Sequence, residues 1–135
     1  MKRKKVQAVI YKEEEGKKEY LILHRKLYWS GWELLKETME QGESFEDTLR
    51  RGIQEEIGVL EIKIEKEKKV HIPFDTEQGI VYVFLVKIDA KEKIDITQEQ
   101  EHDAHKWVTK AEALKLLTYE NAKELLEELT KSQPA

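Results

Sequence analysis

The sequence contains no cysteine, no long apolar run and no excess of basic residues. Without cysteine the chain forms neither disulfides nor a thiolate nucleophile, which fits a reducing cytoplasm. No stretch approaches the roughly 18 apolar residues that a transmembrane helix needs. The N-terminus is basic from Lys2 to Lys5, but no apolar segment follows it, as one would in a secretory signal. We therefore expect a cytoplasmic protein without a membrane partner.

The charge balance bears on binding partners. The 28 acidic residues outnumber the 24 basic ones, so the formal net charge is −4. Nucleic-acid backbones are bound mainly by lysine and arginine, and a short basic N-terminus is a small footprint for such binding. The composition therefore argues against a general nucleic-acid binder.

The length of 135 residues predicts a single domain over 1–135, and the 39% of hydrophobic residues suffice for one modest core.

Segments rich in β-branched and apolar residues predict four strands, at 5–11, 19–25, 60–71 and 79–89. The polar segment 13–17 predicts a hairpin loop, and 28–43, with Gly31 and Gly42, is expected to be irregular. Helices are predicted at 110–117 and 120–129, before a frayed tail at 132–135. This order predicts an α+β domain with a mixed sheet.

A further helix is predicted after Ser44, which is a good N-cap and forms a variant capping box with Asp47. Its apolar residues recur at every fourth position, at Phe45, Leu49, Ile53 and Ile57. Gly58 is a natural end for it. One stripe of this helix is therefore expected to face a core.

Glu55 and Glu56 are adjacent on this helix and share a face with Gly52, away from the apolar stripe. Neighbouring carboxylates repel each other unless a positive charge lies between them, and Mg²⁺ with oxygen ligands is the usual solution. By itself, the pair fits a solvated acidic face better than a metal site in a chain this rich in glutamate.

The surrounding segment, from Trp32 to Val59, resembles the Nudix box, G-x5-E-x7-R-E-U-x-E-E-x-G-U, in which U is aliphatic. Seven of the nine fixed positions match without a gap: Glu43, Arg51, Ile53, Glu55, Glu56, Gly58 and Val59. The lead-in Trp32-x-Leu34, with Glu40 and Gly42, is also similar to the family's pattern. The resemblance implies a Nudix-type α/β/α sandwich whose box spans 37–59.

The same resemblance implies the chemistry. Nudix enzymes hydrolyse a nucleoside diphosphate linked to another group, with Mg²⁺, or alternatively Mn²⁺, as cofactor. Glu55 and Glu56 are the implied metal and catalytic residues. Glu43 and Arg51 pair in this family to hold loop against helix, so we expect a structural role for both.

Two box positions depart from the pattern. Glu37 stands at the opening glycine, and Gly52 stands at the glutamate after Arg51, which is a principal metal ligand in the family. Glycine within a helix costs roughly 1 kcal/mol relative to alanine, so helix stability does not explain Gly52. We hypothesise that Glu37 reaches into the space at Gly52 and supplies the missing ligand. A weak or inactive site, or an unrelated role for Glu37, are the alternatives.

Outside the box, Glu101 lies in a segment similar to E-H-x-A-x-x-W of diadenosine tetraphosphate hydrolases, where a distant carboxylate binds metal or acts as base. Glu99 is the alternative, and His102 and His105 are expected to be surface or packing residues rather than ligands, because Mg²⁺ prefers oxygen. The predicted catalytic and metal residues are thus Glu37, Glu55, Glu56 and Glu101, with Lys36 counted in the metal site.

Substrate contacts are predicted for Arg25 and Lys36, which suit phosphates, and for Trp32 and Tyr82, which suit a base pocket. Tyr82 and Phe84 share a face of their strand, and at least one of these aromatic residues is expected to be core.

The substrate itself is less well determined. The C-terminal segment favours dinucleoside polyphosphates, whereas Pro73, 14 residues past Val59, is a feature of Nudix enzymes that act on ADP-ribose. Nucleoside triphosphates and capped RNA 5′ ends stay open, as does the choice between monomer and homodimer. Because of Gly52, a nucleotide-binding domain without hydrolysis is the competing function.

Overall fold

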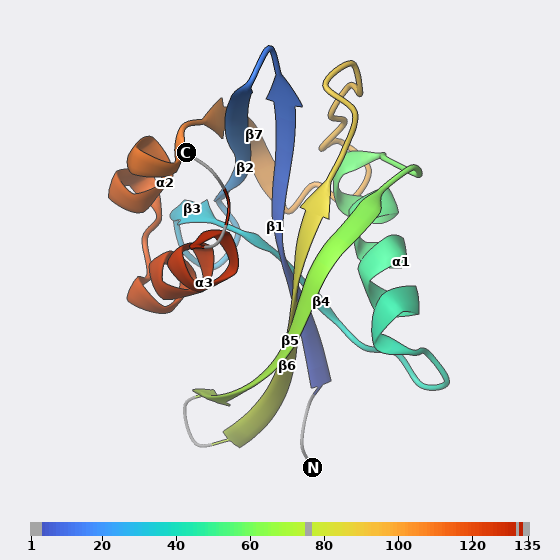
Figure 1. Cartoon of the computed structure of the whole chain (residues 1–135). Coiled ribbons are helices and arrows are strands. Elements are labelled where there is room, and N and C mark those ends of the chain that lie inside the picture. Colours follow the sequence, from blue (N-terminus) through green and yellow to red (C-terminus); the bar gives the residue numbers. More distant parts are fainter. Residues whose placement is uncertain (1–3, 75–76, 132, 134–135) are drawn as a thin grey trace.

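The computed structural model describes residues 4–74, 77–131 and 133 and arranges them around one mixed sheet (Figure 1). The basic residues Lys2 and Arg3, and residues 132, 134 and 135 of the expected tail, lie outside the described residues. The sheet has seven strands: β1 (Lys4–Glu14), β2 (Lys17–Arg25), β3 (Gly31–Glu33), β4 (Leu35–Thr38), β5 (Lys63–Phe74), β6 (Glu77–Lys87) and β7 (His102–Val108).

The strand order is β3-β2-β1-β6-β5, with β4 paired to β1 and β7 paired to β2. Among the described strands β1 and β6 run parallel, and the other pairs are antiparallel. The predicted mixed sheet is therefore confirmed.

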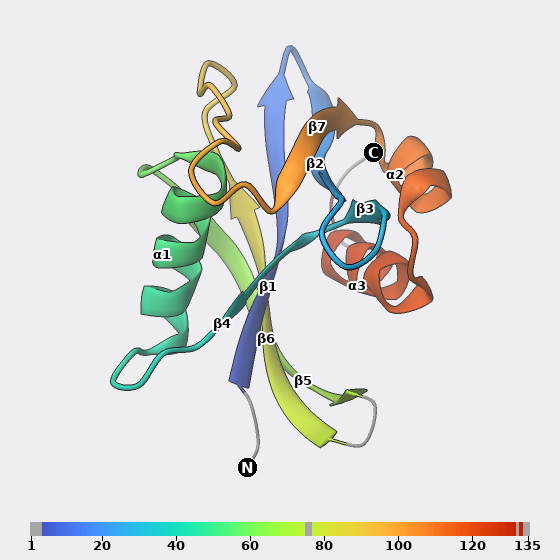
Figure 2. The ribbon, with the colours of Figure 1, turned by 180° about the vertical axis from the view of Figure 1, so that it is seen from behind.

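Helices cover both faces of the sheet. Helix α1 (Phe45–Ile57) lies on one side, and α2 (Lys110–Leu116) and α3 (Glu120–Thr130) lie on the other (Figures 1 and 2). Side chains alternate along the strands, so that on β1 Val9 packs into the core beside α2 and α3 while Ile10 packs into the core beside α1. No described helix is long and apolar enough to cross a membrane.

Helix α1 forms as its sequence predicts. Ser44 Oγ accepts a hydrogen bond from the Asp47 backbone, and Asp47 Oδ2 accepts one from the Ser44 backbone, which completes the capping box. Gly58 ends the helix in the left-handed conformation, at φ 73°. Leu49, Ile53 and Ile57 are fully buried against the sheet. The helix is thus capped at both ends by its own residues.

The expectation of an irregular segment at 28–43 is confirmed for 28–30 and 39–43 and is wrong for 31–33 and 35–38, which are strands. Strand β3 pairs with β2 and strand β4 pairs with β1, with only Leu34 between them. Strand β7 was likewise not predicted. These short strands are polar, and they form because partners distant in sequence supply their hydrogen bonds. Their consequence is that 31–38 crosses the sheet beside α1 and brings Glu33 and Glu37 to the same region.

Candidate functional site

A small pocket of about 140 Å³ lies beside β4 and the C-terminal half of α1. It is lined by Lys5, Arg25, Lys36, Glu37, Thr38, Glu56 and Glu101. Arg25 ends β2, Glu56 lies on α1, and Glu101 immediately precedes β7. Five of the predicted site residues, drawn from four separate segments, therefore meet in one pocket.

Glu56 is the most deeply buried acid of this pocket. Its side chain is 3% exposed, because one turn earlier Gly52 is also buried and this flank of α1 is covered. Among the described residues, Glu56 Oε2 accepts no hydrogen bond. His102 Nδ1 lies 3.1 Å from this oxygen, within ion-pair distance but not aligned as a hydrogen-bond donor. A buried carboxylate oxygen thus faces the pocket without a donor.

His102 is buried between two carboxylates. Its Nε2 lies 2.6 Å from Glu33 Oε2, and its Nδ1 faces Glu56. Burial alone lowers the pKa of His102, but Glu33 and Glu56 outweigh it and raise the pKa from 6.5 to about 9. Of the two expected positions, surface or packing, His102 has the buried one, and its ring is part of the site.

Glu33 links His102 to Arg25, whose Nε donates a hydrogen bond to Glu33 Oε2 over 2.8 Å. Burial raises the pKa of Glu33, yet His102 and Arg25 together bring it below its usual range. Arg25 Nη2 also lies 3.4 Å from Glu101 Oε2. Burial and the neighbouring Glu56 raise the pKa of Glu101. Arg25 therefore balances charge for two acids of the site.

Glu37 packs directly over Gly52. A Cβ atom placed on Gly52 would lie 2.9 Å from Glu37 Cβ and 3.1 Å from its Cγ. Such distances are shorter than van der Waals contact, so a larger residue at 52 and this position of Glu37 exclude each other. Burial raises the pKa of Glu37, although Arg51 opposes the shift.

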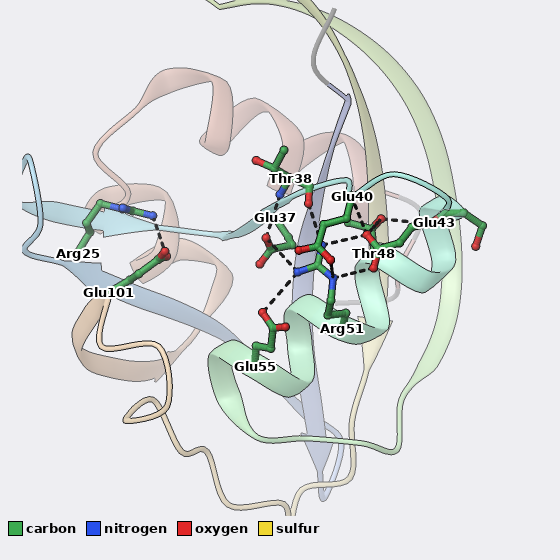
Figure 3. Close-up of polar contacts among 10 residues, drawn as sticks. Arg25, Glu37, Thr38, Glu40, Glu43, Thr48, Arg51, Glu55 and Glu101 are labelled. Carbon is green, nitrogen blue, oxygen red and sulfur yellow. Dashed lines mark hydrogen bonds and ion pairs between the residues drawn. The ribbon is translucent and has the colours of Figure 1, made fainter.

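Arg51 lies at the centre of a carboxylate cluster (Figure 3). Its guanidinium donates to both oxygens of Glu43, over 2.7 and 3.0 Å, and to the Thr38 carbonyl over 2.8 Å. Glu37 and Glu55 each lie 3.4 Å from its Nη1. Arg51 lowers the pKa of Glu43 to about 2. The predicted Glu43–Arg51 pair is present, and it ties the loop before α1 to the helix.

The family comparison agrees with this geometry. A family model described as the NUDIX domain matches residues 1–129. The chain belongs to the Nudix family. Family membership and the fold together confirm a Nudix-type α+β domain and identify a Nudix hydrolase acting on nucleoside diphosphate derivatives.

Solved Nudix structures superimpose on nearly the whole chain. An Ap4A hydrolase of C. elegans in a binary complex gives a TM-score of 0.83 at 22% identity, over 96% of both chains. The NUDIX domain of Shewanella oneidensis NrtR complexed with ADP ribose gives 0.79 at 16% identity, over 99% of this chain and 90% of that one. The E. coli dihydroneopterin triphosphate pyrophosphohydrolase gives a TM-score of 0.73 at 18% identity, over 93% of this chain and 92% of that one. No curated protein matches by sequence.

Glu55 of the Nudix box lies outside the pocket. Its side chain is 40% exposed and faces Arg51. Burial and the nearby Glu99 raise the pKa of Glu55. The structure thus brings Glu37, Glu56 and Glu101 together and leaves Glu55 at the rim.

The two predicted base-pocket aromatics of this Nudix domain lie on opposite faces of the sheet. Trp32 packs against the core beside α2 and α3, with its ring 4.9 Å from that of His24. Tyr82 packs on the α1 face, with its ring 3.5 Å from that of Phe45. The expectation that some of these aromatics are core holds for Phe84, which is fully buried. Trp32 and Tyr82 therefore do not wall one pocket.

Sequence reasoning missed Glu33 and Lys5 and gave His102 no place in the site. Glu33 occupies the variable position of the Trp32-x-Leu34 lead-in, and His102 directly follows Glu101. Both signals were present, but only the pairing of β2 with β3 and β7 brings them together.

His102 also lines a larger hollow of about 640 Å³. It is lined by Lys26, Leu27, Ile96, Thr97, Glu99, Gln100, His102 and Asp103. Its volume is in the range of small-molecule sites, whereas the carboxylate pocket has room only for an ion or a phosphate.

Proposed function

We propose that this Nudix protein is a divalent-cation-dependent pyrophosphohydrolase whose substrates are dinucleoside polyphosphates. The observation that carries the cation dependence is the buried Glu56 carboxylate, whose Oε2 has no hydrogen-bond donor among the described residues. The choice of substrate is supported by the similarity of the segment 101–107 to diadenosine tetraphosphate hydrolases. A buried anion in that state needs a compensating positive charge. Glu101 lies beside it, so a hard cation with oxygen ligands fits the donor set.

The raised pKa values of Glu37 and Glu101 support the same conclusion. Both acids are disfavoured as anions by burial, although Arg51 and Arg25 stand beside them. A divalent cation held by these residues would neutralise pyrophosphate charge and lower the pKa of a water molecule. We assign Glu37, Glu56 and Glu101 to holding it, with Glu55 joining them from the rim.

The cationic side of the pocket suits the phosphates. Arg25 is held in place by Glu33 and Glu101, so its remaining guanidinium N–H groups point in fixed directions. Lys36 is half-buried, and burial together with Lys5 lowers its pKa. A protonated lysine has no lone pair for a metal, so we assign Lys36 to the substrate phosphates rather than to the cation.

Glu101 has the properties of a proton acceptor. Its side chain is 36% exposed, which leaves it in reach of water. Its raised pKa brings its basicity closer to neutral pH, where a general base is most effective. We assign one oxygen of Glu101 to the cation and the other to the proton of the attacking water, while Arg25 orients the carboxylate.

Glu37 is proposed to replace the carboxylate that the family carries at position 52. The close approach of Glu37 to Gly52 supports this exchange, because one side chain fills the space of the other. Glu37→Gln should lower cation-dependent turnover at least tenfold, and the double variant Glu37→Gly/Gly52→Glu should restore most of it. Unchanged turnover in Glu37→Gln contradicts the exchange.

The proposed function is tested by incubating the purified protein with a panel of substrates in Mg²⁺ or Mn²⁺. Dinucleoside polyphosphates, ADP-ribose, nucleoside triphosphates and capped RNA are compared by chromatography of the products. We expect dinucleoside polyphosphates to give the highest kcat/KM. Glu56→Gln should abolish turnover, whereas Glu46→Gln, an exposed control on the same helix, should not.

The competing function, nucleotide binding without hydrolysis, is motivated by Gly52. It predicts stoichiometric binding of one member of the panel in Mg²⁺, with no product released from any of them. That result, obtained with folded protein, would replace the proposed activity.

A further inference from the structure

An imidazole nitrogen lies beside two carboxylates of the site, Glu56 and Glu101. Ligand atoms of Glu56, Glu101 and His102 all lie within 4.8 Å of one another. Glu56 and His102 are buried, at 3% and 7% exposure. Among the residues that the structure describes, no other group of three such residues is close enough to hold an ion.

The spacing of two of these atoms suits one cation. His102 Nδ1 and Glu56 Oε2 are 3.1 Å apart. Two ligands at right angles on a first-row cation, with bonds of about 2.1 Å, are roughly 3 Å apart. The direction matters too. In a hydrogen bond, the acceptor oxygen lies along the direction of the nitrogen lone pair. When nitrogen and oxygen instead bind one cation at right angles, the cation lies along that direction and the oxygen lies about 45° away from it. The N–H of His102 is not aligned with Glu56.

The other ring nitrogen is held as metal-binding histidines are held. Nε2 lies 2.6 Å from Glu33 Oε2, and Glu33 is in turn fixed by Arg25 Nε. A carboxylate that accepts the N–H of one nitrogen sets the tautomer in which the second nitrogen has a free lone pair, and it makes that nitrogen a better donor. Because Glu33 and Glu56 favour protonation of His102, a cation beside Glu56 would displace the Nδ1 proton and take up that lone pair.

We propose that His102 Nδ1 is a ligand of the site's cation, so that the site prefers a first-row transition ion such as Mn²⁺ or Co²⁺ over Mg²⁺. Imidazole nitrogen binds these ions well, whereas Mg²⁺ favours oxygen. The inference rests on the proposed function to the extent that Glu56 and Glu101 hold the same ion. It assigns Glu33 the role of a positioning residue for His102.

The direct test is pulsed electron paramagnetic resonance of Mn²⁺ bound to the full chain. Nitrogen coordination gives a modulation whose frequency changes when the histidine is ¹⁵N-labelled. The chain has four histidines. A variant with His24, His71 and His105 changed to glutamine keeps only His102, so it needs no change at the site. Histidine modulation in this variant is the expected result, and its absence with Mn²⁺ bound overturns the proposal.

Two single variants complete the test. His102→Gln should remove the modulation and weaken Mn²⁺ binding at least tenfold, while Mg²⁺ affinity changes less than twofold. His105→Gln is the matched control and should keep both the modulation and the affinity. Circular dichroism verifies that each variant folds. Equal loss of Mn²⁺ and Mg²⁺ affinity in folded His102→Gln contradicts nitrogen ligation.

Failure of this inference is distinguishable from failure of the proposed function. Mn²⁺-dependent hydrolysis without histidine modulation rejects the nitrogen ligand and leaves the activity standing. Histidine modulation without hydrolysis of any substrate leaves the ligand standing and rejects the activity.

Discussion

Replacing Gly52 by alanine tests how Glu37 is packed against α1. The new methyl carbon would lie 2.9 Å from Glu37 Cβ. Glu37 Cβ cannot rotate away, because β4 is paired to β1 with Glu37 opposite Val6. The strand or the helix must therefore shift, and the Glu37 carboxylate moves with it.

The expected free energies follow from two opposing effects. Alanine in a helix interior is about 1 kcal/mol more favourable than glycine. Overpacking a closed site costs about 1–3 kcal/mol. Gly52→Ala should therefore lower the free energy of unfolding by about 1 kcal/mol in the natural chain. In a Glu37→Gly background the contact is gone, and the same change should raise it by about 1 kcal/mol. The coupling between the two positions is then about 2 kcal/mol.

The assay is urea unfolding of the four proteins of this cycle, followed by tryptophan fluorescence. Slopes of free energy against urea must agree among them for the comparison to hold. Thr38→Gly is the control background, because it loosens the same strand while Glu37 stays over Gly52. In this background Gly52→Ala should still lower the free energy of unfolding. Stabilisation by about 1 kcal/mol in every background would refute the packing argument.

Three further predictions concern charge. Arg51→Lys removes the bidentate contact with Glu43 and should lower the free energy of unfolding by about 2 kcal/mol. The control Arg50→Lys, at an exposed position, should change the free energy of unfolding by less than about 0.5 kcal/mol. Similar losses in both variants contradict a special role for Arg51. The pKa of Glu43 is lowered to about 2 in the folded chain, so on acidification the unfolded chain protonates this carboxylate first. The free energy of unfolding should therefore fall as the pH drops from about 4.5 to about 2. A Glu43→Gln variant with the same dependence of stability on pH contradicts this assignment. Mn²⁺ should raise Tm and EDTA should reverse the effect in the natural chain but not in Glu56→Gln, as measured by calorimetry.

Helix α1 was predictable because its signals are local. The capping box joins residues three apart, and the apolar stripe repeats within one helix. The same applies to the Glu43–Arg51 contact, which spans only eight residues across the start of the helix. Such features need little help from the rest of the chain.

The short strands β3, β4 and β7 were not predictable by the same means. Polar residues such as Lys36 and Lys106 carry no strand pattern of their own, and partners far along the chain decide whether they pair. The face on which Trp32 and Tyr82 lie depends on sheet order and register in the same way. A sequence pattern gives the alternation along one strand but not which helix covers each side.

The sequence by itself determined the family and the identity of most of the acids, because the spacing of Glu43, Arg51 and Glu56 is a local property of a loop and a helix. It also pointed to Glu37 and Gly52 as two departures that belong together. Only the tertiary structure decided that these two positions are in contact, and that Glu33 and His102 close the site around Glu56. The physical reason is that these contacts join residues brought together by long-range strand pairing, whose geometry no local pattern specifies.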